Sequence, residues 1–250
     1  MLSEFNNDTL AGMIKVNPEL EPIIQSIITT NKKTTSMFVH ELRNPLSLLK
    51  GTLQYIEMKQ PEVKGYKYWD QVQDLINDME RIMQDASLLN NSNQLNKEDT
   101  DLISLLDNIF SSFMPQAVAQ EIDLTMSVMP GSEEAFTSYH CDGGKLKQVI
   151  TNIIKNAFEA TKPGSFIHTK LELLGGVGEA PSKLSITISN NGHPIPEDSL
   201  ESIFQPFVTY KKNGTGVGLA LARKVVDLHY GSISVTSDEK LTAFTILLPL

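Results

Sequence analysis

The sequence predicts a two-domain chain of the α + α/β class, in which a helical hairpin that dimerises into a four-helix bundle is followed by an α+β sandwich. Three observations lead to this expectation. Apolar residues recur at alternating steps of three and four early in the chain, a polar stretch at 90–101 lacks that period, and β-rich segments share the second half with amphipathic helices. We expect a short N-terminal segment at 1–20, the hairpin at 21–95 and the sandwich at 96–250.

The hairpin is expected to contain two helices whose apolar seams face each other. The first seam comprises Ile28, Thr35, Val39, Leu42, Leu46, Leu49, Leu53 and Ile56, and the second comprises Trp69, Val72, Ile76, Met79, Met83 and Ala86. The turn-like segment "KQPEVKG" at 59–65 separates the two runs. Because two helices cover only one face of each other, seams this apolar predict a homodimer in which two hairpins form the bundle.

The second half alternates between helical and strand-like patterns. We expect helices at 102–119, at 142–161 with Asp142 as its N-cap, and at about 216–230. Strands are expected at 121–128, 165–173, 182–189, 232–237 and 241–249. Helices and strands that are segregated in this way are typical of an α+β sandwich.

The composition excludes several classes of protein. The chain has 250 residues, 40% of them hydrophobic, and a formal net charge of −9 without a basic cluster, so nucleic acid is not an expected partner. Its single cysteine, Cys141, excludes an intrachain disulfide and argues against a zinc site. No run approaches the roughly 20 apolar residues that span a bilayer, and we expect a cytoplasmic protein without a membrane segment.

The stretch "FVHELRNPLSLLKG" at 38–51 contains a candidate nucleophile. His40 lies one step outside the apolar seam, and Asn44 lies one turn further along the same outer side of the helix. A neutral imidazole has a lone pair that can attack phosphorus, and the neighbouring Glu41 can accept the proton of the other ring nitrogen. The alternative is an ordinary surface histidine on a coiled coil.

Two further motifs indicate a nucleotide site. Asn152, Asn156 and Glu159 form one polar stripe on an otherwise apolar helix, and amide oxygens there suit Mg²⁺. The segment "NGTGVGLA" at 213–220 opens the next helix, whose free N–H groups suit phosphate oxygens. The alternatives are a solvated helix face and a simple helix-entry turn, since the glycine spacing is neither that of a Rossmann motif nor that of a P-loop.

Four stretches, which contain five motifs, together resemble a known family. The stretches "FVHELRNPL", "QVITNIIKNAFEAT", "SNNGHPIP" and "IFQPFVTYKKNGTGVGLALARKVVDLHYGSI" resemble, in order and spacing, the H, N, G1, F and G2 boxes of sensor histidine kinases with a GHKL (Bergerat-type) ATP-binding domain. The resemblance covers about residues 25–250. It implies autophosphorylation from ATP with Mg²⁺, phosphoryl transfer to an aspartate of a response-regulator receiver domain, and a homodimeric histidine kinase.

The resemblance also implies a role for individual residues. His40 would be the phosphoacceptor, Glu41 its general base, and Asn44 the residue that orients water to dephosphorylate the partner. Asn156 would bind Mg²⁺, and Phe204, Phe207, Lys211 and Lys212 would belong to a mobile lid in which aromatic residues either pack or touch the nucleotide. The nucleotide-binding residues would be Asn152, Asn156, Glu159, Asn190, Gly192, Ile195, Phe207, Lys211, Gly214, Thr215, Gly216, Val217, Gly218 and Leu219.

The sequence departs from the family pattern at two positions of the G1 box. Asn190 stands where the family usually has an Asp that accepts from the adenine amino group, a change expected to weaken nucleotide affinity by about 1 kcal/mol. Pro194 replaces the second glycine of that box, so the loop must differ locally. Two other functions therefore stay open: a phosphatase or phosphotransfer protein with weak ATP turnover, and a non-catalytic dimeric nucleotide-binding scaffold.

Overall fold

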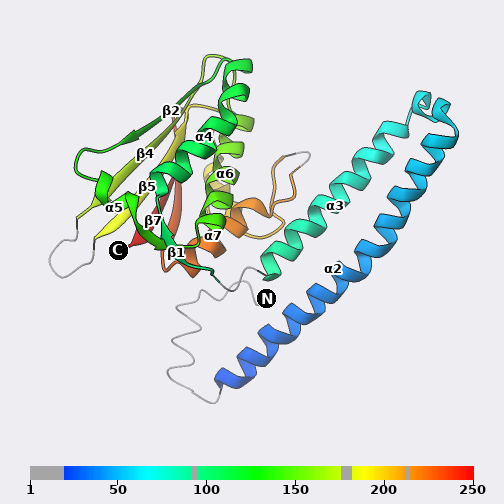
Figure 1. Ribbon diagram of the computed structural model, residues 1–250, viewed down its shortest axis with the longest axis horizontal. Helices are drawn as coiled ribbons and strands as arrows, with labels where there is room; N and C mark the ends of the chain where they lie inside the picture. Colours follow the sequence, from blue (N-terminus) through cyan, green and yellow to red (C-terminus); the bar gives the residue numbers. More distant parts are fainter. Residues whose placement is uncertain (1–19, 92–94, 176–181, 212–213) are drawn as a thin grey trace. The chain divides into compact units, whose positions relative to one another are not determined.

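The computed structural model describes residues 20–91, 95–175, 182–211 and 214–250. The chain divides into two compact units between Asn90 and Asn91, and each is described by itself. The N-terminal unit is helical, and the C-terminal unit contains a sheet with helices (Figure 1). Within the described ranges, no helix is both long enough and apolar enough to cross a membrane.

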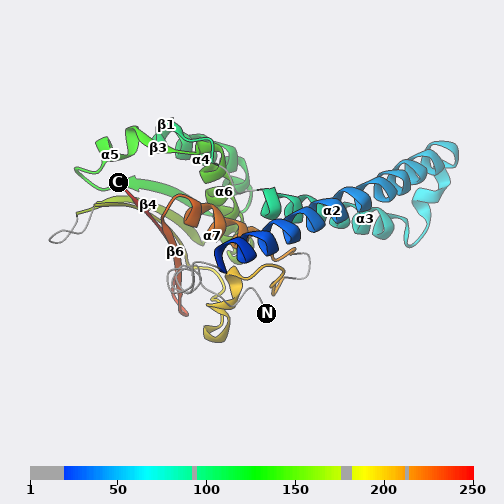
Figure 2. The same cartoon turned by 90° about the horizontal axis from the view of Figure 1, so that it is seen from below.

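The N-terminal unit is a helical hairpin, as the two apolar runs predict. Helix α2 (Leu20–Lys59) is joined by the 3₁₀ helix η1 (Pro61–Gly65) to helix α3 (Trp69–Asn91). The two long helices run side by side in both ribbon views (Figures 1 and 2). They share a small core of Val39, Leu46, Ile76 and Met83, against which Leu53 and Ala86 pack. The helices thus meet along one half of each predicted seam.

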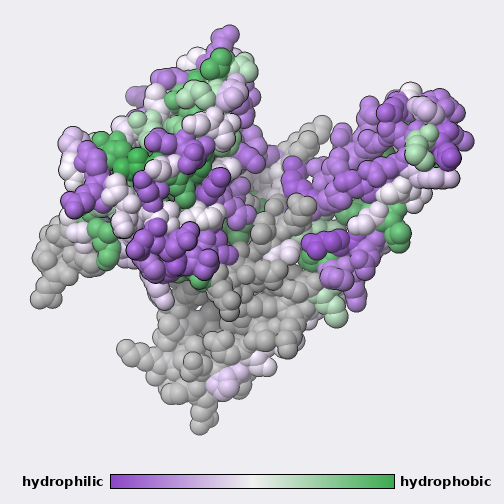
Figure 3. All heavy atoms as spheres, in the orientation of Figure 1, coloured by the Kyte–Doolittle hydropathy of each residue, from purple (hydrophilic) through white to green (hydrophobic). Residues whose placement is uncertain are grey.

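The other half of the seams is uncovered in the single chain. Leu42 is 53% exposed and Leu49 is 50% exposed on α2, and Val72 and Met79 are exposed on α3. Figure 3 shows apolar side chains at the largely polar surface of this hairpin. On α2 the seam residues Val39 and Leu46 face α3, whereas Leu42 and Leu49 lie on a slightly different side of the helix. A single partner helix covers only one of these two sides.

The C-terminal unit is built on a five-stranded sheet with the order β2-β4-β5-β7-β6. The strands are β2 (Asp123–Val128), β4 (Phe166–Leu174), β5 (Lys183–Asn190), β6 (Ser232–Ser237) and β7 (Thr242–Pro249). Only the β2–β4 pair is parallel; the other neighbours are antiparallel. Helices α4 (Leu102–Ala119), α6 (Gly143–Ala160) and α7 (Gly218–Leu228) cover one face of the sheet (Figure 2). The predicted α+β sandwich is confirmed.

The helices of this layer begin where the sequence chemistry places them. Asp101 caps α4 and Asp142 caps α6, each by accepting a hydrogen bond from a backbone N–H in the first turn. The predicted cap at Asp142 is confirmed. Beneath these helices lies an aliphatic core, whose fully buried members include Leu102, Leu146, Ile154, Ile167, Leu171 and Ile186.

Several short elements complete this unit. Strands β1 (Glu98–Thr100) and β3 (Tyr139–Cys141) form a separate two-stranded sheet. Helix α5 (Glu133–Thr137) lies between β2 and β3, and the 3₁₀ helices η2 (Glu197–Ser199) and η3 (Ser202–Phe204) follow β5. The sequence patterns miss all five, because segments of three to five residues are too short to show a period.

Candidate functional site

The first candidate group lies on the exposed side of α2. His40, Glu41 and Asn44 are all exposed, whereas Val39, the residue before the histidine, is buried. Helix α2 continues through Pro45, whose missing N–H leaves the Glu41 carbonyl without its usual helical donor. Because His40 is exposed, its imidazole is accessible to an incoming group.

The polar stripe of α6 contacts two other segments of the same unit. The Asn152 amide Nδ2 donates to the carbonyl of Gly218, the first residue of α7, over 3.2 Å. One turn further on, the Asn156 amide oxygen accepts from the Lys211 ammonium group over 2.7 Å. The stripe is therefore not merely a solvated helix face. Asn152 and Asn156 each contact a residue that the sequence also assigns to the nucleotide site, Gly218 and Lys211 respectively.

Lys211 also forms an ion pair with Glu159, so the Asn156 amide oxygen and the Glu159 carboxylate both bind the Lys211 ammonium group. An amide oxygen and a carboxylate are ligands that Mg²⁺ uses when substrate phosphates and waters complete its octahedron. Among the described residues no group of three or more His, Cys, Asp or Glu forms a metal site. These two oxygen ligands therefore fit Mg²⁺ that arrives with a nucleotide, but they do not form a complete protein cage.

The start of α7 differs from those of α4 and α6. Its N-cap, Val217, is buried and supplies no side-chain hydrogen bond to the first N–H groups of α7. Gly218 begins the helix, and Thr215 and Leu219 flank this turn as partly exposed residues. An uncapped helix start with glycine approaches is suited to phosphate oxygens.

The glycines before α7 permit a close backbone approach. Gly216 has φ +67°, and a Cβ there would lie 2.6 Å from the Phe207 carbonyl carbon. The Phe207 N–H donates to the Gly216 carbonyl over 2.9 Å. A Cβ on Gly214 would lie 2.4 Å from the Thr209 hydroxyl. No other residue type fits these positions without displacing the segment around Lys211.

The two lid phenylalanines have different environments. Phe204 is buried, lies edge-on to Phe244 with 6.3 Å between ring centroids, and carries the Arg223 guanidinium over its ring. Phe207 is 60% exposed. Phe204 therefore packs in the core, as the packing alternative for these aromatic residues anticipates, and only Phe207 is free to contact a ligand. Lys212 lies outside the described residues.

The remaining predicted nucleotide residues lie at the end of β5. The Asn190 side chain is only 2% exposed, and its amide nitrogen has no hydrogen-bond partner within the described residues. A Cβ on Gly192 would lie 2.4 Å from the carbonyl of Ala160, the last residue of α6. The Ile195 N–H donates to the Ser237 hydroxyl over 2.8 Å. The loop after β5 is thus held against α6 and β6.

Sequence reasoning missed two residues in this region. Thr169 on β4 is fully buried, and its hydroxyl, like the Asn190 amide nitrogen, has no partner in the described structure. Ser237, at the end of β6, holds the loop after β5. The alternation of "FIHTKLEL" places Thr169 on the same strand face as Ile167 and Leu171, a signal that was available in the sequence.

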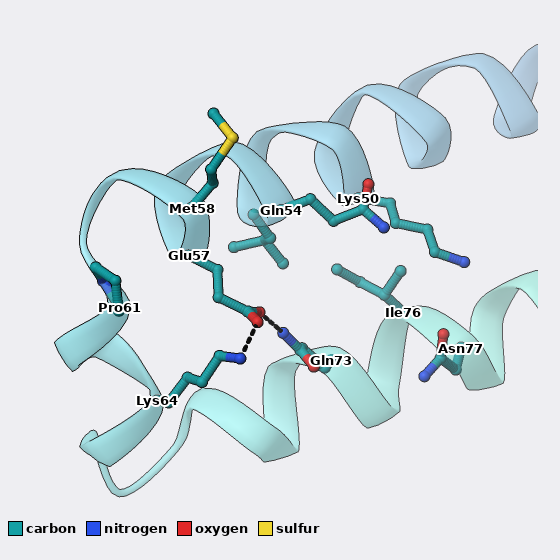
Figure 4. A pocket seen from close by; sticks show the side chains of 10 residues that line it. Lys50, Gln54, Glu57, Met58, Pro61, Lys64, Gln73, Ile76 and Asn77 are labelled. Carbon is teal, nitrogen blue, oxygen red and sulfur yellow. Dashed lines mark hydrogen bonds and ion pairs between the residues drawn. The ribbon is translucent and has the colours of Figure 1, made fainter.

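A groove of about 540 Å³ lies in the hairpin, far along the chain from these residues. It lies where α2, η1 and α3 meet, and Figure 4 shows the Lys64 and Gln73 side chains directed at the Glu57 carboxylate. The Lys64 ammonium and the Gln73 amide approach that carboxylate to 2.6 and 2.7 Å. These contacts lower the pKa of Glu57 and join the helices near the turn. None of the predicted catalytic or nucleotide-binding residues lines this groove.

Comparisons with known proteins agree with the two-unit architecture. Residues 141–250 match the family described as histidine kinase-, DNA gyrase B-, and HSP90-like ATPase. Sporulation kinase A of Bacillus subtilis (strain 168) is 32% identical over 213 residues, which cover 84% of this chain and 33% of that protein. The chain spans about half or less of the length of the curated relatives it matches.

Solved structures extend the comparison. The catalytic domain of the histidine kinase ThkA is 30% identical, with a TM-score of 0.54 over 62% of this chain and 95% of that domain. The complex of ThkA with the response regulator protein TrrA has a TM-score of 0.63, covers 92% of this chain and 65% of that chain, and is 24% identical. The second likeness concerns the fold alone.

Proposed function

Because the chain belongs to the histidine kinases that have a GHKL-type catalytic domain, we propose that it transfers the γ-phosphoryl group of ATP to His40. The phosphoryl group then passes to an aspartate of a response-regulator receiver domain. The observation that supports this function best is the pairing of Asn156 and Glu159 around a cation, on the α6 face whose Asn152 reaches the uncapped start of α7.

His40 acts as the nucleophile. A ring nitrogen of its exposed imidazole forms the bond to phosphorus, while the bond from the γ-phosphorus to the bridging oxygen breaks and ADP leaves. Glu41, the next residue on α2, is positioned to accept the proton of the other ring nitrogen through a rotation of its exposed side chain. Exposure of all three α2 residues leaves room for both the nucleotide and the receiver domain.

Asn156 and Glu159 would hold Mg²⁺, in place of the Lys211 ammonium group that they contact in this structure. Bound Mg²⁺ neutralises phosphate charge, which favours transfer of the phosphoryl group. The first N–H groups of α7, with Gly214, Gly216 and Gly218 beside them, bind phosphate oxygens. Asn190, Gly192 and Ile195 line the base end, and exposed Phe207 lies in the segment that covers the nucleotide.

The hairpin is the proposed dimerisation element. Leu42 and Leu49 on α2 and Met79 on α3 are about half exposed, although they occupy seam positions. A second hairpin buries these side chains and completes the four-helix bundle, which contributes roughly 25 cal/mol for each Å² of apolar surface removed from water. The exposed His40 side is left free, because it is not a seam position.

Autophosphorylation tests the proposed kinase. The protein is incubated with γ-labelled ATP and Mg²⁺, and the label is scored as acid-labile and base-stable. Wild type and His140→Gln, a matched change at an exposed histidine outside the nucleotide loop, are expected to become labelled, while His40→Gln loses more than about 99% of the label because the proposed phosphoacceptor is gone. Label that persists in His40→Gln, or nucleotide binding without label in wild type, contradicts the kinase and favours the scaffold alternative.

Phosphatase activity is a second candidate function, and the position of Asn44 supports it. The residue is exposed one turn from His40, on the same side of α2, where its amide can orient a water molecule toward a phosphorylated receiver. Asn44→Ala is expected to slow phosphate release from a phosphorylated receiver at least tenfold while leaving autophosphorylation intact. Equal release by the variant and wild type contradicts this role.

A further inference from the structure

The Asn190 amide nitrogen is buried without a hydrogen-bond partner within the described residues, although several polar groups of the loop around it have one. It ends β5, where its backbone pairs with Ile167 on β4 and Thr242 on β7. The amide nitrogen has no hydrogen bond within the described residues, and neither does the hydroxyl of Thr169, which lies diagonally across on β4. Folded proteins rarely leave such groups unpaired, and each unpaired group destabilises the fold.

Groups around Asn190 are already committed. The Asn191 side-chain oxygen accepts from the Phe166 N–H over 2.8 Å. The Thr242 and Ser237 hydroxyls lie 2.6 Å apart and bond to each other. The His193 N–H donates to the Ala160 carbonyl over 2.9 Å. These bonds hold the loop in place, and the Asn190 amide nitrogen and the Thr169 hydroxyl are left as the buried groups available to a ligand.

An amide differs from a carboxylate in what it can recognise. An ionised carboxylate only accepts hydrogen bonds, whereas an amide offers an acceptor and a donor side by side, and a half turn about its terminal bond exchanges them. The 6-amino group and N1 of adenine present a donor beside an acceptor, while the 6-oxo group and N1–H of hypoxanthine or guanine present the reverse order. An asparagine matches either order; an aspartate repels the 6-oxo group.

We propose that Asn190 allows the nucleotide site to bind 6-oxopurine triphosphates as well as ATP. This rests on the proposed function, because it takes the end of β5 as the base end of the nucleotide site. Asn190 is therefore a specificity-determining residue: it pairs with adenine in one amide orientation and with a 6-oxopurine in the other. Its burial strengthens the discrimination, since water does not compensate a mismatched group there.

Equilibrium binding tests the inference without requiring turnover. The dissociation constants of ATP and inosine triphosphate, which differ only at the 6-position and N1, are measured with Mg²⁺ by calorimetry on wild type, Asn190→Asp and Asn191→Asp. Asn191→Asp is the matched control, because it adds the same charge one residue away and keeps an oxygen for the Phe166 N–H. Thermal unfolding establishes that each variant is folded.

For wild type and for Asn191→Asp, we expect the dissociation constant of inosine triphosphate to be within about tenfold of that of ATP. Asn190→Asp is expected to raise the ratio of the inosine triphosphate constant to the ATP constant at least about tenfold, because it weakens the binding of inosine triphosphate selectively. Asn190→Ala is expected to weaken the binding of both nucleotides to a similar extent. This variant serves as a substitute if the Asn190→Asp protein does not fold. Wild type that binds ATP but rejects inosine triphosphate, or an unchanged ratio in Asn190→Asp, overturns the inference alone. Wild type that binds neither nucleotide overturns the proposed nucleotide site as well.

Discussion

The two units bury their apolar residues to very different degrees. The most buried apolar residue of the described hairpin is Val63, at 4% exposure, and its central core has only four buried members. The sheet unit contains an aliphatic layer whose largest side chains, among them Ile154, Leu171 and Ile186, are essentially inaccessible. The sheet unit therefore has a core sufficient for its own stability, whereas the apolar seams of the hairpin are only half covered in a single chain, as expected for the proposed dimer.

Their proposed functional groups differ in the same way. Those of the hairpin, His40 and Asn44, are exposed on a regular helix, where a partner protein can reach them. Those of the sheet unit lie at the edge of its core, where Asn190 is buried and unpaired and the start of α7 is uncapped. A surface group serves a macromolecular partner, and a group at the core edge serves a small ligand that must be desolvated.

Shortening one aliphatic side chain in each unit, buried in the sheet unit and half exposed in the hairpin, gives the largest expected contrast. Ile186→Ala in β5 is expected to lower the free energy of unfolding of the sheet unit by about 2–5 kcal/mol, because it leaves a cavity at a fully buried site. Leu42→Ala is expected to lower the free energy of unfolding of the hairpin by less than about 1 kcal/mol in dilute protein, because Leu42 is half exposed. Urea unfolding followed by circular dichroism, with hydrogen exchange to separate the units, measures both. Equal losses in free energy of unfolding would mean that Leu42 is as fully buried in the folded protein as Ile186.

A charge in the uncovered seam tests the proposed second copy. Leu49→Asp is expected to weaken dimerisation at least about a hundredfold, since it buries a carboxylate against apolar partners. Leu48→Asp is the matched control, because Leu48 is 73% exposed and lies outside the seam. Sedimentation equilibrium gives both dissociation constants. The interface is misplaced if the two variants weaken the dimer equally.

Acid is expected to destabilise the sheet unit through a buried histidine. His229 accepts the Asp142 N–H at Nε2 over 3.0 Å, and Nδ1 lies 2.8 Å from the Val225 carbonyl. Burial lowers the pKa of His229, although the Val225 carbonyl acts in the opposite direction. The folded state therefore keeps His229 neutral where the unfolded chain is protonated, so its contribution is complete above about pH 6.5 and is lost as the pH falls.

Thermal unfolding at pH 7 and pH 5 measures this loss, expected to reach about 2 kcal/mol at most. His229→Gln retains an acceptor for the Asp142 N–H and is expected to remove most of the pH dependence. His140→Gln, at an exposed histidine, is expected to keep it. A pH dependence that survives in His229→Gln assigns the effect to another group.

The smallest effect concerns two glycines, one in each unit. Gly51 in α2 has open space where a Cβ would stand, so Gly51→Ala is expected to stabilise the helix by about 0.5–1 kcal/mol. Gly192→Ala is expected to destabilise the sheet unit, because its Cβ would lie 2.4 Å from the Ala160 carbonyl. Thermal unfolding shows whether each variant has a higher or a lower melting temperature than wild type. A stabilising Gly192→Ala would show that the loop after β5 is free to move.

The long elements were predictable because their patterns are repetitive. The expected helix at 102–119 and the strand at 232–237 coincide with α4 and β6, and the other long elements of the sheet unit differ by about two residues at their ends. Aspartate caps and periods of 2 or 3.6 are local features of the chain, so they are readable without a structure. The polar stretch at 90–101, from which the sequence predicts a boundary between hairpin and sandwich, has no period, and the structure divides between Asn90 and Asn91.

The short elements and the environments of the site residues were not readable. Phe204 and Phe207 belong to one motif, yet the first packs against Phe244 and the second is exposed, because η3 ends between them and the chain turns at positive φ. The partnership of Lys211 with Asn156 and Glu159 joins residues more than fifty positions apart. Only the packing of the segment before α7 onto α6 decides such contacts.

The sequence by itself determined the class of each unit, the positions of its long elements and the residue types that suit phosphoryl chemistry. The tertiary structure alone decided which of those residues meet, which seam positions stay uncovered, and that Asn190 lacks a partner. The physical reason is range. Periodicity and capping act over a few residues, whereas burial and hydrogen-bond satisfaction depend on every element that packs around a side chain.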